Sequence, residues 1–186
     1  MNAFDLFNGW AGLSSSGRDP FTEARRAIAR GQQIFNTRPI PIQGVSGLNG
    51  QLFASGVRAP DSFKGTCTIC HDTPNVGNHS VKAPLNIGLT DASRRTGDMP
   101  LYTLANRATG ETIQTTDPGR AMITGKWRDI GKFKGPILRG LAARAPYFHN
   151  GSAATLEEVV EFYDTRFNIG LTAQEKSDLV AFLRAL

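Results

Sequence analysis

The two cysteines of the chain lie in one short motif that is typical of covalent haem attachment. Residues 67–71 read Cys67-Thr68-Ile69-Cys70-His71, which is the pattern C-x-x-C-H. Two cysteines three positions apart, at the start of a helical turn, can form thioethers to the two vinyl groups on one edge of a haem. The histidine that follows then lies beneath the ring, with an imidazole nitrogen within reach of the iron. The motif predicts one haem c, attached through Cys67 and Cys70, with His71 as an iron ligand.

Two other chemistries of this motif have little support in the sequence. A zinc site needs two further Cys or His ligands, whereas His79 and His149 stand alone rather than in a paired spacing. A redox-active cysteine pair of the thioredoxin type needs a βαβ context, and the sequence pattern does not provide one. We therefore interpret the motif as a haem site.

The residue on the other side of the iron would separate an electron carrier from a ligand-binding or peroxidatic centre. The side chains that could coordinate there are Met99, Met122, His79, His149 and Tyr163. Each has an ordinary role as well: Met122 suits core packing, and Met99 and His79 suit loops. Tyr163 shares an apolar helical face with Val159, Val160 and Phe167, so from the residues alone we interpret it as a core aromatic.

Positive charge is concentrated in one part of the chain. Lys and Arg number 21 against 16 Asp and Glu, which gives a net charge of +5. Between residues 119 and 144 a single anion, Asp129, accompanies the cations Arg120, Lys126, Arg128, Lys132, Lys134, Arg139 and Arg144. Such a segment could bind phosphates, steer an acidic protein partner, hold a buried anionic cofactor, or simply be solvated. Because no nucleic-acid-binding signature accompanies it, we do not expect nucleic acid as a partner.

Length and composition point to one folded domain. The chain has 186 residues, of which 40% are hydrophobic and 20% charged, a balance typical of globular proteins. No apolar run approaches the roughly 20 residues that span a bilayer, so no membrane span is expected. The first residues lack the basic and apolar regions of a signal peptide. We expect a mature form or a fragment, with an N-terminal extension over 1–18 and a single c-type haem domain over 19–186.

Helix signals are clearest near the two ends of the chain. Asp19 followed by Pro20 predicts a helix of about 17 residues, with Gly31 on its apolar face, where another helix could cross closely. Thr155 and Thr172 each begin a capping box, which predicts helices to about Phe167 and to the C-terminus.

The segments between these helices look irregular. Residues 36–66 are rich in Gly, Pro and Ser and predict a long irregular connection. A small hairpin is expected within 101–124, with residues 117–119 as turn residues, and a short helix could begin in 135–139. The predicted fold class is mostly α: a cytochrome c-like helical domain whose long loops wrap a covalent haem.

Several ordered segments resemble one known family. Residues 138–152, LRGLAARAPYFHNGS, and their continuation to Tyr163 are similar to the C-terminal haem domain of bacterial di-haem cytochrome c peroxidases. Residues 117–120 and 131–136 also look like segments of that family, and the resemblance covers roughly residues 19–186. The wider family includes the haem enzyme that matures the tryptophan-derived quinone of methylamine dehydrogenase.

The resemblance implies roles for several side chains. In the peroxidases a distal methionine lies fourteen residues after the histidine of the Pro-Tyr-Phe-His motif, and the quinone-maturing branch has an iron-ligating tyrosine at that place. Counted from His149, this position is Tyr163, which becomes the leading distal ligand. His149 is then a residue near the haem, the second candidate ligand, or an acid–base group. Arg139, with Lys132 or Lys134 as further candidates, would face the haem propionates.

The chain departs from the family in its haem count. Family enzymes carry two C-x-x-C-H motifs, whereas this sequence has one. The chain is therefore either part of a di-haem protein or a mono-haem cytochrome. The family implies a periplasmic location, because c-type haem is attached outside the bacterial cytoplasmic membrane.

Three functions fit this pattern. The first is electron transfer with a redox partner protein or a second haem domain. The alternative is a haem peroxidase or oxidase that acts on peroxide or O2, alone or with a second haem chain, with His149 as its acid–base group. A small-ligand sensor is the third hypothesis.

Overall fold

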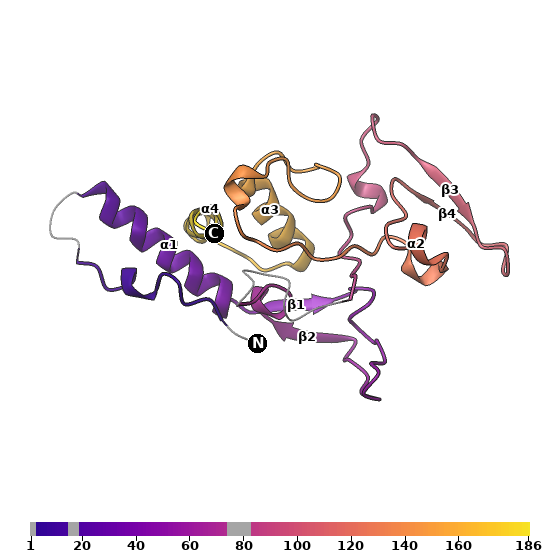
Figure 1. The fold of residues 1–186 in the computed structure, drawn as a ribbon, viewed down its shortest axis with the longest axis horizontal. Helices are drawn as coiled ribbons and strands as arrows, with labels where there is room; N and C mark the ends of the chain where they lie inside the picture. The colour runs from indigo at the N-terminus through magenta and orange to yellow at the C-terminus, as the bar shows by residue number, and fades with distance from the viewer. Residues whose placement is uncertain (1–2, 15–18, 74–82) are drawn as a thin grey trace. The chain divides into compact units, whose positions relative to one another are not determined.

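The computed structural model describes residues 3–14, 19–73 and 83–186. The described residues form two compact units, which lie within Met1–Ile42, Ser62–Lys82 and Gly135–Leu186, and within Gln43–Asp61 and Ala83–Lys134. The helices and strands are α1 (Pro20–Thr37), β1 (Ile40–Gln43), β2 (Ser62–Gly65), β3 (Tyr102–Ala105), β4 (Thr112–Thr115), α2 (Ala121–Thr124), α3 (Leu156–Phe167) and α4 (Ala173–Arg184). The mostly helical fold with a small hairpin confirms the predicted fold class (Figure 1).

Helix α1 begins where the sequence predicts. The carboxylate of Asp19 accepts hydrogen bonds from the backbone N–H groups of Phe21 and Thr22, and Pro20 is the first helical residue. These contacts satisfy N–H groups that have no partner inside the helix. The predicted apolar face is correct at Gly31 and Phe35, but Phe21 is 72% exposed, because it lies in the first turn beyond the packed part of the helix.

Helix α1 lies against α4, and Gly31 makes their close approach possible (Figure 1). A Cβ atom built at Gly31 would come within 2.7 Å of the Cβ of Phe182, and nearer still to the backbone carbonyl of Asp178. Phe182 has no exposed surface and packs against Phe4 and Phe35. Phe4 lies in the segment predicted as an extension, yet it is only 2% exposed and belongs to the core.

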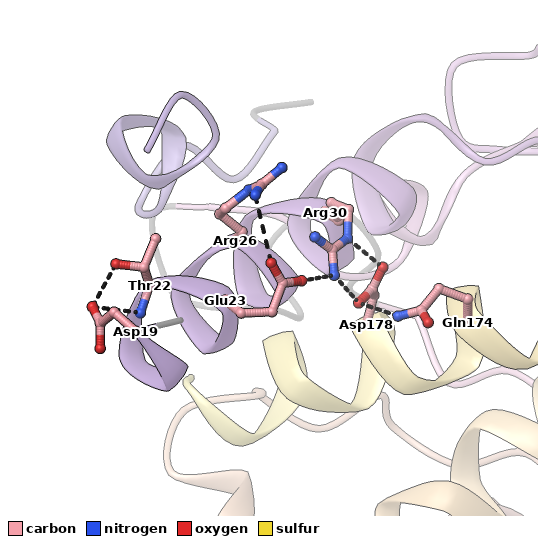
Figure 2. Close-up of polar contacts among 7 residues, drawn as sticks. All are labelled: Asp19, Thr22, Glu23, Arg26, Arg30, Gln174 and Asp178. Atoms are coloured by element: carbon pink, nitrogen blue, oxygen red, sulfur yellow. Dashed lines mark hydrogen bonds and ion pairs between the residues drawn. The ribbon is translucent and has the colours of Figure 1, made fainter. Parts of the chain in front are cut away.

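A polar network also joins α1 to α4 (Figure 2). Arg30 donates to both carboxylate oxygens of Asp178, at 2.7 and 2.9 Å, and also to Glu23 at 2.9 Å. Gln174 donates to Asp178 at 3.0 Å. Hydrogen bonding to Asp178 raises the pKa of Arg30 above its ordinary value. Asp178 is 3% exposed, so these contacts neutralise a carboxylate that would otherwise be buried without a counter-charge.

The capping residues of α3 and α4 are as predicted. The Thr172 hydroxyl accepts from the backbone N–H of Glu175, whose carboxylate in turn accepts from the N–H of Thr172, which completes a capping box. At α3 the Thr155 hydroxyl accepts from Glu158, but the carboxylate of Glu158 bonds to the N–H of Ala154 instead. The second box is therefore not reciprocal.

The irregular segments differ from the prediction in three places. Strands β1 and β2 pair with each other inside the segment predicted as an irregular connection. The hairpin β3–β4 exists, but its turn lies between Asn106 and Gly110, and residues 117–119 form a separate turn after β4. The helix predicted to begin in 135–139 is wrong. A 3-10 turn forms instead at Leu141–Ala143, after Gly140 with a φ of 68°.

The core of the first unit is built from α1, α3 and α4. Its fully buried side chains include Phe35 of α1, Leu156 and Val160 of α3, and Phe182 of α4. Cys67 packs against this cluster, which places the C-x-x-C-H motif beside the hydrophobic core of the unit. Among the described residues, no helix combines the length and apolar character needed to cross a bilayer.

Candidate haem site

The C-x-x-C-H motif folds into a tight helical turn. Cys67–Ile69 is a 3-10 turn that follows β2, and the carbonyl of Cys67 accepts from the backbone N–H groups of Cys70 and His71, at 3.2 and 3.0 Å. The motif therefore has the local conformation that its spacing predicts. Gly65 packs closely against the motif, because a Cβ atom there would overlap the Cδ1 of Ile69 and would lie 2.7 Å from the Cδ1 of Ile42.

The two cysteines are free and half-buried. Burial raises the pKa of the Cys67 thiol to about 12, with a further contribution from Cys70. Burial likewise raises the pKa of Cys70 to about 11. Both sulfurs therefore carry protons at neutral pH. Among the described residues no group of three His, Cys, Asp or Glu side chains that could hold a metal ion is present.

His71 presents a neutral imidazole. Burial lowers its pKa to about 4, although the Pro136 carbonyl and the charge of Asp72 oppose this shift. Within the described residues no hydrogen bond of ordinary geometry reaches its buried Nδ1, even though the Pro136 carbonyl lies close to the ring. A neutral imidazole beside a backbone carbonyl suits an iron ligand. One ring nitrogen can bind the iron, while the N–H of the other ring nitrogen points to the carbonyl and orients the ring. The donor set of Cys67, Cys70 and His71 thus fits a c-type haem.

Tyr163 of α3 belongs to the same compact unit as this motif. Burial raises the pKa of its phenol above the ordinary value, and electrostatic interactions with Cys70 and Cys67 raise it further, so the phenol lies within electrostatic range of both thiols. Its ring contacts those of Phe162 and Phe167, with centroids 5.3 and 6.2 Å away. The structure therefore places the phenol of Tyr163 within electrostatic range of the two cysteines and packs its ring against aromatic side chains.

The other predicted residues occupy different surroundings. His149 and Arg139 are exposed residues of the first unit. In the second unit Met122 is 75% exposed, Met99 is half-buried, and Lys132 is buried with its Nζ 3.4 Å from Asp129. Lys134 is exposed, and His79 lies outside the described residues.

Sequence reasoning missed two contributors to this site. Pro136, whose carbonyl influences the pKa of His71, appeared only in a family segment and in the segment where a short helix was expected, and no role at the haem was given to it. Phe148 stacks edge-on against Phe162 at 4.9 Å and adopts a φ of 64°, which is unusual for an aromatic residue. A positive φ at a residue other than glycine leaves no mark in the sequence, so only its position in the Pro-Tyr-Phe-His motif could have drawn attention to it.

Comparisons with known proteins agree with this geometry. A family model described as RoxA-like, cytochrome c-like matches residues 132–169. The cytochrome-c peroxidase IdrP1 of Pseudomonas sp. is 32% identical over 189 residues, which covers 88% of this chain and 49% of that protein. IdrP1 of Denitromonas iodatirespirans is 36% identical over 190 residues, covering 89% of this chain and 50% of that protein.

A solved structure shares the fold. The crystal structure of a MauG-like protein associated with microbial copper homeostasis aligns with 97% of this chain at 25% identity, with a TM-score of 0.51, and the alignment covers 46% of that protein. This likeness confirms the predicted cytochrome c-like fold with a small hairpin. The chain spans about half the length of the two IdrP1 relatives and of the MauG-like chain.

The relatives imply a c-type haem for this chain, and the motif at residues 67–71 supplies the residue types that such a haem requires. The comparisons and the site agree: over about half of the length of those proteins, the chain is a relative of the bacterial cytochrome c peroxidases and shares the fold of a MauG-like protein.

Proposed function

We propose that the chain is a mono-haem electron-transfer domain that corresponds to the C-terminal half of a di-haem peroxidase. Cys67 and Cys70 would hold one haem c covalently, and His71 and Tyr163 would supply the protein ligands of its iron. Both compact units, over residues 19–186, belong to this one haem domain, and its location is the bacterial periplasm. A haem held in this way supplies one-electron chemistry between the ferric and ferrous states.

The observation that supports this proposal is that the phenol of Tyr163 lies in the same compact unit as the motif and within electrostatic range of its two thiols. A protein ligand on each side of the iron leaves no open position for peroxide or O2, which favours electron transfer over catalysis at this site. A phenolate ligand also favours the ferric state and lowers the reduction potential relative to methionine.

The other residues near the site have supporting roles in this proposal. His71 donates its neutral nitrogen to the iron, and the Pro136 carbonyl orients its ring. Phe148, Phe162 and Phe167 fix the ring of Tyr163 through aromatic contacts and keep water away from it. Arg139, which is exposed, faces the propionates.

Peroxide chemistry is better assigned to a partner. The relatives named cytochrome-c peroxidases are about twice as long as this chain, so a second haem domain or subunit could carry that reaction and receive electrons from this one. Peroxidase or oxidase activity of this chain alone would need an open iron position and an acid–base group such as His149.

The test is an optical titration of the purified haem-loaded protein in its ferric state. Under this proposal, excess cyanide and hydrogen peroxide leave the spectrum unchanged, and a redox titration shows one reversible one-electron step. Rapid cyanide binding, together with turnover of peroxide, would instead establish the peroxidase alternative.

A further inference from the structure

A closed surface loop in the second unit is the strongest feature outside the haem site. The two ends of residues 119–132 lie next to each other and close the loop. Gly119 pairs with Lys132 in a β-bridge, and the N–H of Arg120 donates to the Lys132 carbonyl at 2.9 Å. The N–H of Gly131 donates to the carbonyl of Pro118 at 3.0 Å. The loop contains α2 (Figure 1) and the 3-10 turn Trp127–Asp129. Loops of this closed form are compact and frequently functional.

A buried carboxylate holds the loop together from inside. Asp129 is 8% exposed and accepts a hydrogen bond from the Thr124 hydroxyl at 2.9 Å. The Nζ of Lys132 lies 3.4 Å from one of its oxygens, and the Nε of Arg120 lies 3.7 Å from the other. The charge of Lys132 is therefore paired with Asp129 within the loop. Arg120 and Lys132, at the two ends of the loop, both contact Asp129.

The outer side chains of the loop are apolar and basic. Ile123 is 89% exposed and Met122 is 75% exposed, the two highest values among the exposed large hydrophobic residues described. Lys126 and Arg128 are also exposed, and within the described part of the chain neither forms an ion pair. We call these four residues the loop surface.

An ordered loop that exposes two neighbouring apolar side chains beside uncompensated cations has the composition of a transient docking site. Electron-transfer complexes bury little area and depend on charge to bring the proteins together quickly. A small apolar contact then holds the encounter briefly, while the cations select a partner of opposite charge.

We propose that the loop surface docks a small acidic electron-carrier protein, whose carboxylates surround an apolar contact patch. The proposal rests on the electron-transfer function above and adds to it the site and charge of the partner. Nucleic acid and anionic membranes share the negative charge, but an exposed isoleucine and methionine on a closed loop suit a protein face better than a phosphate backbone.

The test measures electron transfer to carriers of opposite charge. The dithionite-reduced haem protein is freed of excess dithionite and mixed in a stopped-flow instrument with oxidised plastocyanin, an acidic blue-copper protein. One electron leaves the protein and is taken up by Cu(II), giving Cu(I), with no bond formed or broken. Oxidised mitochondrial cytochrome c, which is basic, serves as the second carrier, and 1,4-benzoquinone, a neutral small oxidant, reports the redox competence of the haem itself.

Two loop variants are compared with a matched control. Arg128→Glu is expected to slow the reaction with plastocyanin about tenfold at low ionic strength, because it changes the local charge by two units near the partner. The difference should fall below about twofold at high salt. Arg107→Glu, in the exposed turn between β3 and β4, makes the same charge change elsewhere and is expected to have less than about a twofold effect. Ile123→Ser is expected to slow the reaction about fivefold at any ionic strength, through lost apolar contact.

The outcomes separate this proposal from the function on which it rests. If benzoquinone oxidises all variants equally while only the loop variants lose their rate with plastocyanin, the docking site is supported. Equal loss in Arg128→Glu and Arg107→Glu, or faster transfer to basic cytochrome c than to plastocyanin, would overturn it. Failure of benzoquinone to oxidise the reduced wild-type protein would instead count against the electron-transfer function. Binding of the protein to an oligonucleotide and to an anionic vesicle is measured as well. If Arg128→Glu weakens this binding but leaves the rate with plastocyanin unchanged, the loop surface binds those ligands and the proposal is overturned.

Discussion

Tyr163 shows how far the residues of the site can be predicted from sequence. Cys67, Cys70 and His71 are contiguous, so their spacing alone specifies the chemistry. Tyr163 lies far along the chain on an apolar helical face, and periodicity by itself indicates a core aromatic. In the structure the phenol ring of Tyr163 packs against Phe167, as a core aromatic would. The same phenol also interacts electrostatically with the two thiols. Its proximity to the cysteines depends on tertiary folding, which only the family resemblance could anticipate.

The ligand role of Tyr163 predicts the behaviour of Tyr163→Phe. Removal of the phenol oxygen should change the ferric spectrum of the haem-loaded protein and open a position for cyanide, from no detectable binding to stoichiometric binding. The reduction potential should rise, because the stabilisation of ferric iron by phenolate is lost. Optical titration and potentiometry measure these effects.

His149→Ala is the control for that experiment. His149 is exposed, so its replacement should leave the ferric spectrum and the cyanide response as in the wild-type protein. If His149→Ala changes the spectrum and Tyr163→Phe does not, the iron ligand has been assigned to the wrong residue.

At the scale of elements, the helices were more predictable than the strands. Asp19, Thr155 and Thr172 mark the starts of α1, α3 and α4, because capping is local chemistry within a few residues. Strands β1 and β2 were missed, since they pair across a separation of about twenty residues. Strand β1 alternates between buried and exposed residues but has only four residues, one of them Pro41, and β2 shows no such alternation. The segment 135–139 was expected to begin a helix, but the chain takes a left-handed φ of 68° at Gly140 and forms the 3-10 turn Leu141–Ala143 instead.

The contact between α1 and α4 predicts that Gly31→Ala destabilises the fold. A Cβ at Gly31 would overlap the backbone of Asp178 as well as Phe182, and backbone atoms cannot move aside as a flexible side chain can. We expect the free energy of unfolding to fall by about 2–3 kcal/mol, measured by chemical denaturation of the haem-loaded protein. Gly9→Ala serves as the control, because no atom lies within 4 Å of a Cβ at that position. If Gly31→Ala changes the free energy of unfolding by less than about 0.5 kcal/mol, α1 and α4 are not packed as closely as the structure has them.

At the scale of the whole molecule, ion pairs predict a loss of stability in acid. Lys176 joins α4 to α3 through Asp164 at 2.8 Å and Glu161 at 2.6 Å. Burial alone would raise the pKa of Asp164, but hydrogen bonds from Lys176 and Leu171 outweigh it and lower the pKa below its ordinary value of 3.8. The unfolded chain therefore binds a proton at higher pH than the folded one, and the stabilisation is present above pH 3.8 and lost as the pH falls through the folded value.

This linkage predicts the effect of Asp164→Asn. The variant should lose about 1–2 kcal/mol of unfolding free energy at neutral pH and show a smaller decline than the wild-type protein as the pH falls below about 4. Denaturation curves at several pH values measure both effects. Asp61→Asn, at a side chain that is 88% exposed, is the control and should follow the wild-type curve. Parallel curves for Asp164→Asn and wild type would show that other carboxylates dominate.

The haem content of the protein tests the account most directly. The single C-x-x-C-H motif accounts for both cysteines, while the peroxidase relatives are about twice as long. Denaturing mass spectrometry and a haem assay of the protein, matured by a bacterial cytochrome c assembly system, should give the chain mass plus one haem and one haem per chain, with none retained in Cys67→Ala/Cys70→Ala. A chain that carries no covalent haem, or a double variant that keeps it, would contradict the account.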